Sequence, residues 1–191
     1  MDYYSYICTM KYTKTKIEGV FIIEPKVFPD ARGYFFEAFK NEEFEQNVGH
    51  VDFVQENESK SSYGVLRGLH YQKGEYSQAK LVRVIKGRVL DVAVDLRKGS
   101  ATFGEHISVE LSDENKLQLF IPRGFAHGFL VLSDEAVFIY KVDNVYAPAQ
   151  EASIRFDDPQ LAINWPIDAD KMLLSDKDLR AVSFSAAELF E

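Results

Sequence analysis

Short apolar runs separated by turn residues make up most of this sequence. The clearest run is 88–96, in which every second residue of 90–96 is apolar while Asp91 and Asp95 point to the other face. A period of two is the pattern of a β-strand. By the same reasoning we expect strands at residues 20–23, 34–39, 65–71, 80–85, 88–96, 106–111, 117–121, 128–132 and 136–142. Lys86-Gly87, between two such runs, predicts a hairpin turn.

Helix is predicted at two places, residues 41–48, where Phe44 and Val48 are four apart, and residues 176–190. Many short strands with few, mainly C-terminal, helices predict an all-β fold, an antiparallel β-sandwich or barrel. The sequence shows no internal repeat or linker, so we expect a single domain over residues 17–191. Residues 1–16, rich in tyrosine, are expected to form an N-terminal extension.

Composition narrows the class of protein. With 191 residues, 46% of them hydrophobic, the chain can bury a single core. The one cysteine, Cys8, cannot form an internal disulfide, which favours a reducing cytoplasm. No apolar run is long enough to span a membrane. The net charge of −8 argues against general nucleic-acid binding but permits a small anionic ligand, since binding depends on the local field of a cleft.

The first candidate catalytic residues are Arg67 and His70, which lie in an apolar, strand-like run at residues 64–72. In a regular strand these two side chains point to opposite faces, so a joint role requires an irregularity, which Gly68 between them could supply. Lys80, Tyr140 and Asp178 recur downstream in strand-like or loop settings. A base, a cation, a phenol and a carboxylate are a set of groups for proton transfer. The alternative is that His70 and Tyr140 are hydrogen-bonded core residues.

A turn motif bears on metal binding. Residues 122–127 read Pro-Arg-Gly-Phe-Ala-His, and this Pro-x-Gly-x-x-His pattern resembles the second motif of cupins. In metal-binding cupins that histidine joins a His-x-His pair and a glutamate, but here the corresponding site reads His70-Tyr71-Gln72. Two histidines fall short of the three protein ligands usual at a catalytic metal, so no metal is expected.

Taken in order, the motifs resemble the dTDP-4-dehydrorhamnose 3,5-epimerase family of metal-independent cupins. The resemblance runs over residues 17–183 and rests on segments 28–37, 53–57, 65–72, 80–83, 124–129, 140–141, 174–175 and 177–178. It implies a cupin-type jelly roll, no cofactor, a cytoplasmic homodimer in which strands cross between subunits, and dTDP-4-keto-6-deoxyglucose as substrate. Arg32 or Glu37 could then serve the neighbouring site.

The resemblance also implies residue roles. His70 resembles the base, Asp178 its carboxylate partner, Tyr140 the acid on the opposite face of the sugar, and Lys80 the group beside the enolate oxygen. Family members contact the sugar nucleotide at the positions of Arg32, Glu37, Gln55, Asn57, Arg67, His127, Glu151 and Lys177, and stack a ring on the thymine at that of Tyr146.

The expected chemistry suits these groups. In a 4-keto-6-deoxyhexose the C4 carbonyl acidifies the C–H bonds at C3 and C5, so epimerisation needs no redox cofactor. It does need proton removal on one face and proton return on the other. An ammonium roughly 3 Å from the enolate oxygen is worth up to about 5 kcal/mol at an effective dielectric near 20.

Other functions stay open at this point. One is a related enzyme that epimerises a single carbon or moves the ketone to C3, and another is a sugar-nucleotide-binding domain without activity. A metal-dependent cupin is a more distant alternative.

Overall fold

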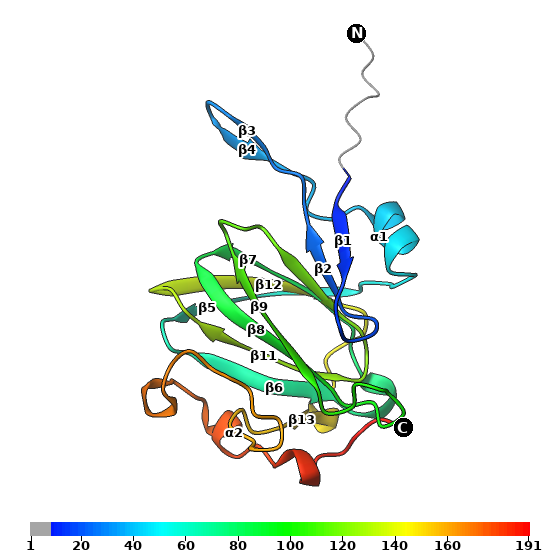
Figure 1. Cartoon of the computed structure of the whole chain (residues 1–191), viewed down its shortest axis with the longest axis vertical. Helices are drawn as coiled ribbons and strands as arrows, with labels where there is room; N and C mark the ends of the chain where they lie inside the picture. Colours follow the sequence, from blue (N-terminus) through cyan, green and yellow to red (C-terminus); the bar gives the residue numbers. More distant parts are fainter. Residues whose placement is uncertain (1–8) are drawn as a thin grey trace.

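Two antiparallel sheets face each other and form the body of the molecule (Figure 1). The structure is a computed structural model, which describes residues 9–191. The first sheet has the order β1 (Lys11–Lys14), β2 (Phe21–Glu24), β10 (Gln118–Ile121), β7 (Lys80–Lys86), β12 (Glu135–Val142) and β5 (Gln55–Ser62). The second has the order β13 (Glu151–Ser153), β6 (Leu66–Gln72), β11 (Phe125–Val131), β8 (Arg88–Asp95) and β9 (His106–Ser112). The predicted all-β, cupin-like sandwich is confirmed.

The remaining elements are short. Strands β3 (Phe28–Asp30) and β4 (Gly33–Phe35) pair in a hairpin that extends away from the sandwich (Figure 1). The helices are α1 (Asn41–Asn47), α2 (Asp176–Leu179) and the 3₁₀ turns η1 (Gly74–Tyr76), η2 (Pro148–Gln150), η3 (Ala169–Lys171) and η4 (Phe184–Ala186). None of the helices in the described part has the length and hydrophobicity that crossing a bilayer demands.

Strand β8 is buried on both faces. Its inner-face residues Val89 and Ala93 pack between the sheets, whereas Val92 and Val94 pack on the outside against the C-terminal segment. The predicted alternation is therefore present, but the polar face looks into the sandwich rather than into solvent. Asp91, on that inner face, is fully buried and hydrogen-bonded, as a buried carboxylate must be.

A predicted turn and the end of a predicted strand are wrong. Lys86-Gly87 is not a hairpin turn, because β7 and β8 belong to different sheets and the chain crosses between them there. Gly87 has φ +79°, and a Cβ on it would lie 2.0 Å from the carbonyl oxygen of Glu135, which explains the glycine without a hairpin. The strand expected at 34–39 ends at Phe35.

The helix expected at 176–190 is also wrong over most of its length. Only Asp176–Leu179 and the 3₁₀ turn Phe184–Ala186 are helical. Val182 forms a β-bridge with Ile154, and Phe190 forms one with Arg97. The backbone groups of these residues therefore pair with other segments and not within a helix. The helix expected at 41–48 is confirmed as α1.

Four strands were not predicted: β1, β3, β5 and β13. Strand β5 reads Gln-Glu-Asn-Glu-Ser-Lys-Ser-Ser and has no apolar residue to reveal its period. Strand β1 lies within residues 1–16, where an extension was expected, and it pairs with β2. Residues 1–8 of that segment, with Cys8, lie outside the described residues. The boundary at residue 17 stays a prediction.

Candidate active site

A pocket of about 280 Å³ lies between the two sheets. Its walls come from both sheets and from α2, and it is lined by Glu58, Ser59, Arg67, His70, Lys80, His127, Phe129, Phe138, Tyr140, Glu151 and Lys177. Seven of these are predicted site residues, which the sequence scatters over more than a hundred positions. The other four were not predicted, and two of them, Phe129 and Phe138, form a stacked pair with ring centroids 4.2 Å apart.

The expected irregularity in β6 is present. His127 of β11 is opposite His70, and Phe129 is opposite Arg67, so two steps along β11 correspond to three along β6. Gly68 lies inside this bulge with φ +141°, and a Cβ on it would lie 2.4 Å from Cα of Gly128. The extra residue reverses the strand's alternation, and both Arg67 and His70 therefore line the pocket.

His70 forms a dyad with Asp178. Its Nε2 lies 2.6 Å from Oδ1 of Asp178, a residue that is only 4% exposed. The hydroxyl of Ser175 donates to the other oxygen, Oδ2, at 2.6 Å, and the backbone N–H of Asp178 donates back to Ser175 in a capping box. Burial raises the pKa of Asp178, but hydrogen bonds from His70 and Ser175 outweigh it and leave that pKa below its usual value. Ser175 is a positioning group that its sequence context did not reveal.

Tyr140 approaches from the opposite sheet. It lies on β12, where Asn57 of β5 is its cross-strand partner. Burial raises the pKa of Tyr140, while a hydrogen bond with Asn57 and the charge of Arg67 act in the other direction. The phenol is therefore protonated near neutral pH and can act as an acid.

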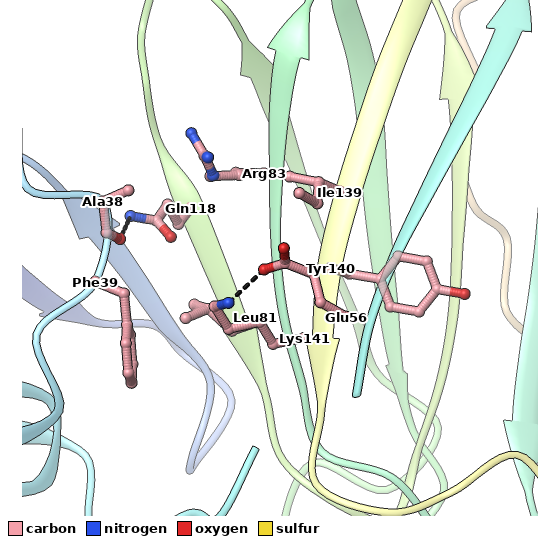
Figure 2. A pocket seen from close by; sticks show the side chains of 9 residues that line it. All are labelled: Ala38, Phe39, Glu56, Leu81, Arg83, Gln118, Ile139, Tyr140 and Lys141. Carbon is pink, nitrogen blue, oxygen red and sulfur yellow. Dashed lines mark hydrogen bonds and ion pairs between the residues drawn. The ribbon is translucent and has the colours of Figure 1, made fainter. Parts of the chain in front are cut away.

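Figure 2 shows the outer face of the same sheet, where a second pocket of about 260 Å³ lies beside Phe39, Glu56, Arg83 and Lys141. The ring of Tyr140 extends away from this outer pocket, toward the other side of its strand (Figure 2). Residues that line the outer pocket pair with each other, Glu56 with Lys141 and Gln118 with the carbonyl of Ala38. Of the residues predicted for proton transfer, His70, Lys80 and Asp178 do not line this outer pocket, and Tyr140 lines it with its ring directed away.

Lys80 is the first residue of β7 and supplies the cation of the inner pocket. Burial lowers its pKa to about 8, although the charges of Asp91 and Glu151 act to raise it, and that of Lys177 acts to lower it further. An ammonium in such a poorly solvated position stabilises a developing anion more strongly than it does in water.

His127 is buried deeper in the pocket. Its Nε2 lies 3.0 and 2.9 Å from the two carboxylate oxygens of Asp91. Burial lowers the pKa of His127, against the opposing effect of Asp91. The site thus contains two histidine–aspartate pairs, and Asp91 was not predicted to belong to it.

Glu151, Lys177 and Tyr146 form a linked group at the pocket. Lys177 makes an ion pair with Glu151, and the hydroxyl of Tyr146 donates to Glu151 Oε2 at 2.9 Å. Burial raises the pKa of Glu151, but these two hydrogen bonds lower it below its ordinary value. Tyr146 is 53% exposed, which leaves its ring available for stacking.

The sequence matches the profile of the family described as dTDP-4-dehydrorhamnose 3,5-epimerase over residues 14–186. A dTDP-4-dehydrorhamnose 3,5-epimerase of Shigella flexneri is 55% identical over 182 residues, which cover 95% of this chain and 99% of that protein. The chain belongs to the dTDP-4-dehydrorhamnose 3,5-epimerase family.

Solved structures of this epimerase family share the fold. An epimerase from Legionella pneumophila, in complex with dTDP-4-keto-L-rhamnose, has a TM-score of 0.91 at 48% identity and covers 95% of this chain and 98% of its own. ChmJ, a 3'-monoepimerase from Streptomyces bikiniensis in complex with dTDP-quinovose, has a TM-score of 0.84 at 39% identity, covering 90% and 86%.

Some residues expected to bind substrate in this epimerase family lie outside the pocket. Gln55 and Asn57 do not line it, although Asn57 adjoins Tyr140 and accepts a hydrogen bond from Gln55 at 2.8 Å. Arg32 lies in the exposed β3–β4 hairpin, where it pairs with Asp30. Glu37 follows that hairpin and does not line the pocket either. Their predicted roles in substrate binding remain predictions.

Within residues 9–191, no three His, Cys, Asp or Glu side chains converge in an arrangement suited to a metal ion. A metal-free reaction stays a prediction.

Proposed function

We propose that this chain is an isomerase that epimerises C3 and C5 of dTDP-4-dehydro-6-deoxy-D-glucose and so produces dTDP-4-dehydro-L-rhamnose for dTDP-L-rhamnose synthesis. The observation that carries the proposal is the position of the proton-transfer groups. His70, paired with Asp178 of α2, is on one sheet and Tyr140 is on the facing sheet, with one pocket between them. A ketosugar in that pocket can lose a proton on one face and gain one on the other.

His70 is the base in this mechanism, and its reacting atom is Nδ1, because Nε2 is engaged with Asp178. The proton on C3 or C5 moves to Nδ1, and the electron pair of the broken C–H bond becomes the enolate whose charge rests on the C4 oxygen. Asp178 stabilises the imidazolium that results. Lys80 stabilises the enolate oxygen.

Tyr140 completes the step from the opposite face. Its hydroxyl gives a proton to the carbon as the carbonyl re-forms, which leaves a phenolate on Tyr140 and an extra proton on His70. Exchange with solvent restores both groups, so the returning proton derives from water. The reaction needs no cofactor, because the carbonyl of the substrate accepts and returns the electron pair.

The decisive test is incubation of the protein with dTDP-4-keto-6-deoxyglucose in D₂O, followed by NMR. We expect deuterium at both C3 and C5, and NADPH consumption when a 4-ketoreductase is coupled. In His70→Ala, exchange at both carbons should fall about 10²- to 10⁴-fold. In Tyr140→Phe, product formation should suffer more than proton removal. A binding domain without activity would give no label anywhere.

A single-centre epimerase is the second candidate, because ChmJ, named a 3'-monoepimerase, shares the fold at 39% identity. A ChmJ double mutant with a histidine changed to asparagine and a tyrosine to phenylalanine has also been solved. Deuterium at C3 alone would favour this candidate, and a product with its ketone at C3 would indicate a ketoisomerase.

We also propose a homodimer in which the β3–β4 hairpin reaches the neighbouring pocket. Tyr34 and Phe35 on that hairpin are 57% and 64% exposed, the hairpin extends away from the sandwich (Figure 1), and Arg32 does not line the pocket of its own chain. An extended hairpin with exposed aromatic rings suits burial against a partner. The single cysteine favours a cytoplasmic location.

A further inference from the structure

We infer that Asp91 is a positioning residue: it holds His127 in the tautomer whose Nδ1 accepts a hydrogen bond from a sugar hydroxyl. The inference deepens the proposed epimerase function, on which the role of the sugar hydroxyl rests.

Asp91 is placed by strand register. On β8 it is the cross-strand partner of Phe129, two residues beyond His127 on β11. Side chains in this diagonal relation lie within reach of each other on the same face. The surrounding inner face is apolar: Val89 and Ala93 flank Asp91 on its own strand. Phe138 lies against the His127 ring, with centroids 6.1 Å apart.

A carboxylate in such surroundings needs a hydrogen-bond donor. Asp91 is 0% exposed, and among residues 9–191 its hydrogen bonds come from Nε2 of His127 alone. A carboxylate accepts and does not donate, so Nε2 carries a hydrogen. Leaving Asp91 without this donor would carry the full desolvation cost of a buried charge.

The other ring nitrogen then faces the ligand. No hydrogen bond to Nδ1 of His127 is present within the described residues, yet no fully buried side-chain nitrogen or oxygen among them lacks a partner. Nδ1 is therefore accessible from the pocket that His127 lines. Because Nε2 carries the hydrogen and burial lowers the pKa of His127, the ring is neutral at pH 7 and Nδ1 is an acceptor. Sugar hydroxyls are the donors it suits.

Charged groups on the neighbouring elements affect the Asp91–His127 pair. Lys80 of β7 and His70 of β6 both act to lower the pKa of His127, whereas Asp91 acts to raise it. The pKa of Lys80 depends on the charges of Asp91, of Glu151 on β13 and of Lys177 on α2. Among the charges that keep Lys80 protonated, Asp91 has the largest effect, so neutralising it lowers the pKa of Lys80 further.

The test uses Asp91→Asn, with Asp95→Asn as a matched control. Asp95 is on the same face of the same strand, is also 0% exposed, and is bonded to Arg97, Ser100 and Thr102 away from the pocket. Long-range ¹H–¹⁵N NMR of the four histidines reads the tautomer of His127 in the free protein. The pH profile of kcat/KM reads the charge of Lys80.

We expect wild-type His127 to be in the Nε2–H tautomer. In Asp91→Asn a mixture of tautomers should appear, kcat/KM should fall about ten- to a hundredfold, and its alkaline limb should move to lower pH. Asp95→Asn should lose stability but keep the tautomer and the alkaline limb.

Two results would overturn the inference. One is a wild-type His127 that is charged or protonated at Nδ1, which can be seen even if Asp91→Asn does not fold. The other is a folded Asp91→Asn with unchanged tautomer and pH profile. The tautomer of His127 is measured without substrate, so this test is independent of activity. A wild-type protein that fails to label the ketosugar would refute the proposed function, whereas the NMR result alone would decide whether Asp91 positions His127.

Discussion

The two carboxylate oxygens of Asp178 have different hydrogen-bond partners, and Ser175 is one of them. One oxygen binds His70, and the other accepts the Ser175 hydroxyl at 2.6 Å, so the carboxylate plane is fixed from both sides. His70 and Asp178 were predicted from the sequence, but no sequence pattern indicated that the serine three residues before Asp178 both caps α2 and orients the dyad. An aspartate in a short helix has many rotamers, and only the packed structure selects one.

Replacement of Ser175 by alanine should therefore have two effects. Loss of the cap should lower the free energy of unfolding by about 1 kcal/mol, because the orphan N–H of Asp178 loses its acceptor. The freer carboxylate should lower kcat several-fold with little change in KM. Denaturant unfolding and steady-state kinetics measure the two effects, and Ser175→Thr, which keeps the hydroxyl, should restore both. A variant with reduced stability and an unchanged kcat would argue against the orienting role.

The charge of Lys80 predicts the alkaline limit of the reaction. Burial lowers its pKa to about 8, so the ammonium beside the enolate is lost as pH rises past that value. We expect kcat/KM to fall above about pH 8, and Lys80→Arg to move that limb upward even if its maximum is lower. The folded state should not unfold for this reason. Between about 8 and 10.5 the unfolded chain binds more protons at Lys80 than the folded one does, and stability rises with pH there. A flat profile to pH 10 would contradict the assignment.

At the scale of elements, the bulge in β6 brings Arg67 and His70 to one pocket. Strand period and the glycine made this irregularity predictable, and the structure confirms it. The alternation of apolar and polar residues along β8 was also predicted, but the sequence did not show which of its two faces lies inside the sandwich. Which face of a strand is interior depends on what covers the other face, and here the C-terminal segment does so. Asp91 was therefore assigned to the face opposite the apolar residues, but its burial and its contact with His127 were not predicted.

Gly68→Ala tests the bulge. A Cβ there would lie 2.4 Å from Cα of Gly128, a backbone atom that cannot move without shifting β11. We expect a loss of more than about 2 kcal/mol in unfolding free energy and a larger loss of activity than stability alone explains, because both Arg67 and His70 are displaced. Gly49→Ala is the control, since its φ of +121° is comparably unusual but nothing lies within 4 Å of the added carbon. Equal effects of the two substitutions would show that the contact with Gly128 is unimportant.

At the scale of the whole molecule, one chain does not bring every predicted group together. Arg32 and Glu37 are absent from the pocket lining, and the β3–β4 hairpin that carries Arg32 extends away from the sandwich. Sequence motifs identify residues that serve one reaction without stating which subunit they serve. The family resemblance alone suggested a shared site.

Mixed dimers can decide this point. Arg32→Ala and His70→Ala should each be nearly inactive as homodimers, and co-expressed chains should regain about a quarter of wild-type activity, because half of random dimers contain one intact site. The intact site takes His70 from one chain and Arg32 from the other. Absence of any recovery, with mixed dimers verified by mass spectrometry, would place Arg32 in its own chain's site or outside any site.

The cross-strand pairing of His70 with His127 has a consequence for the sugar. Both imidazoles are fixed to a hydrogen-bonded ladder, and Tyr140 is fixed to another ladder between β5 and β7. These groups cannot migrate from C3 to C5 without breaking a sheet. In the proposed reaction, two epimerisations in one visit therefore require the pyranose to change its pucker beside a stationary pair of groups. The flexibility that the reaction needs resides in the ligand, and the protein contributes a rigid frame.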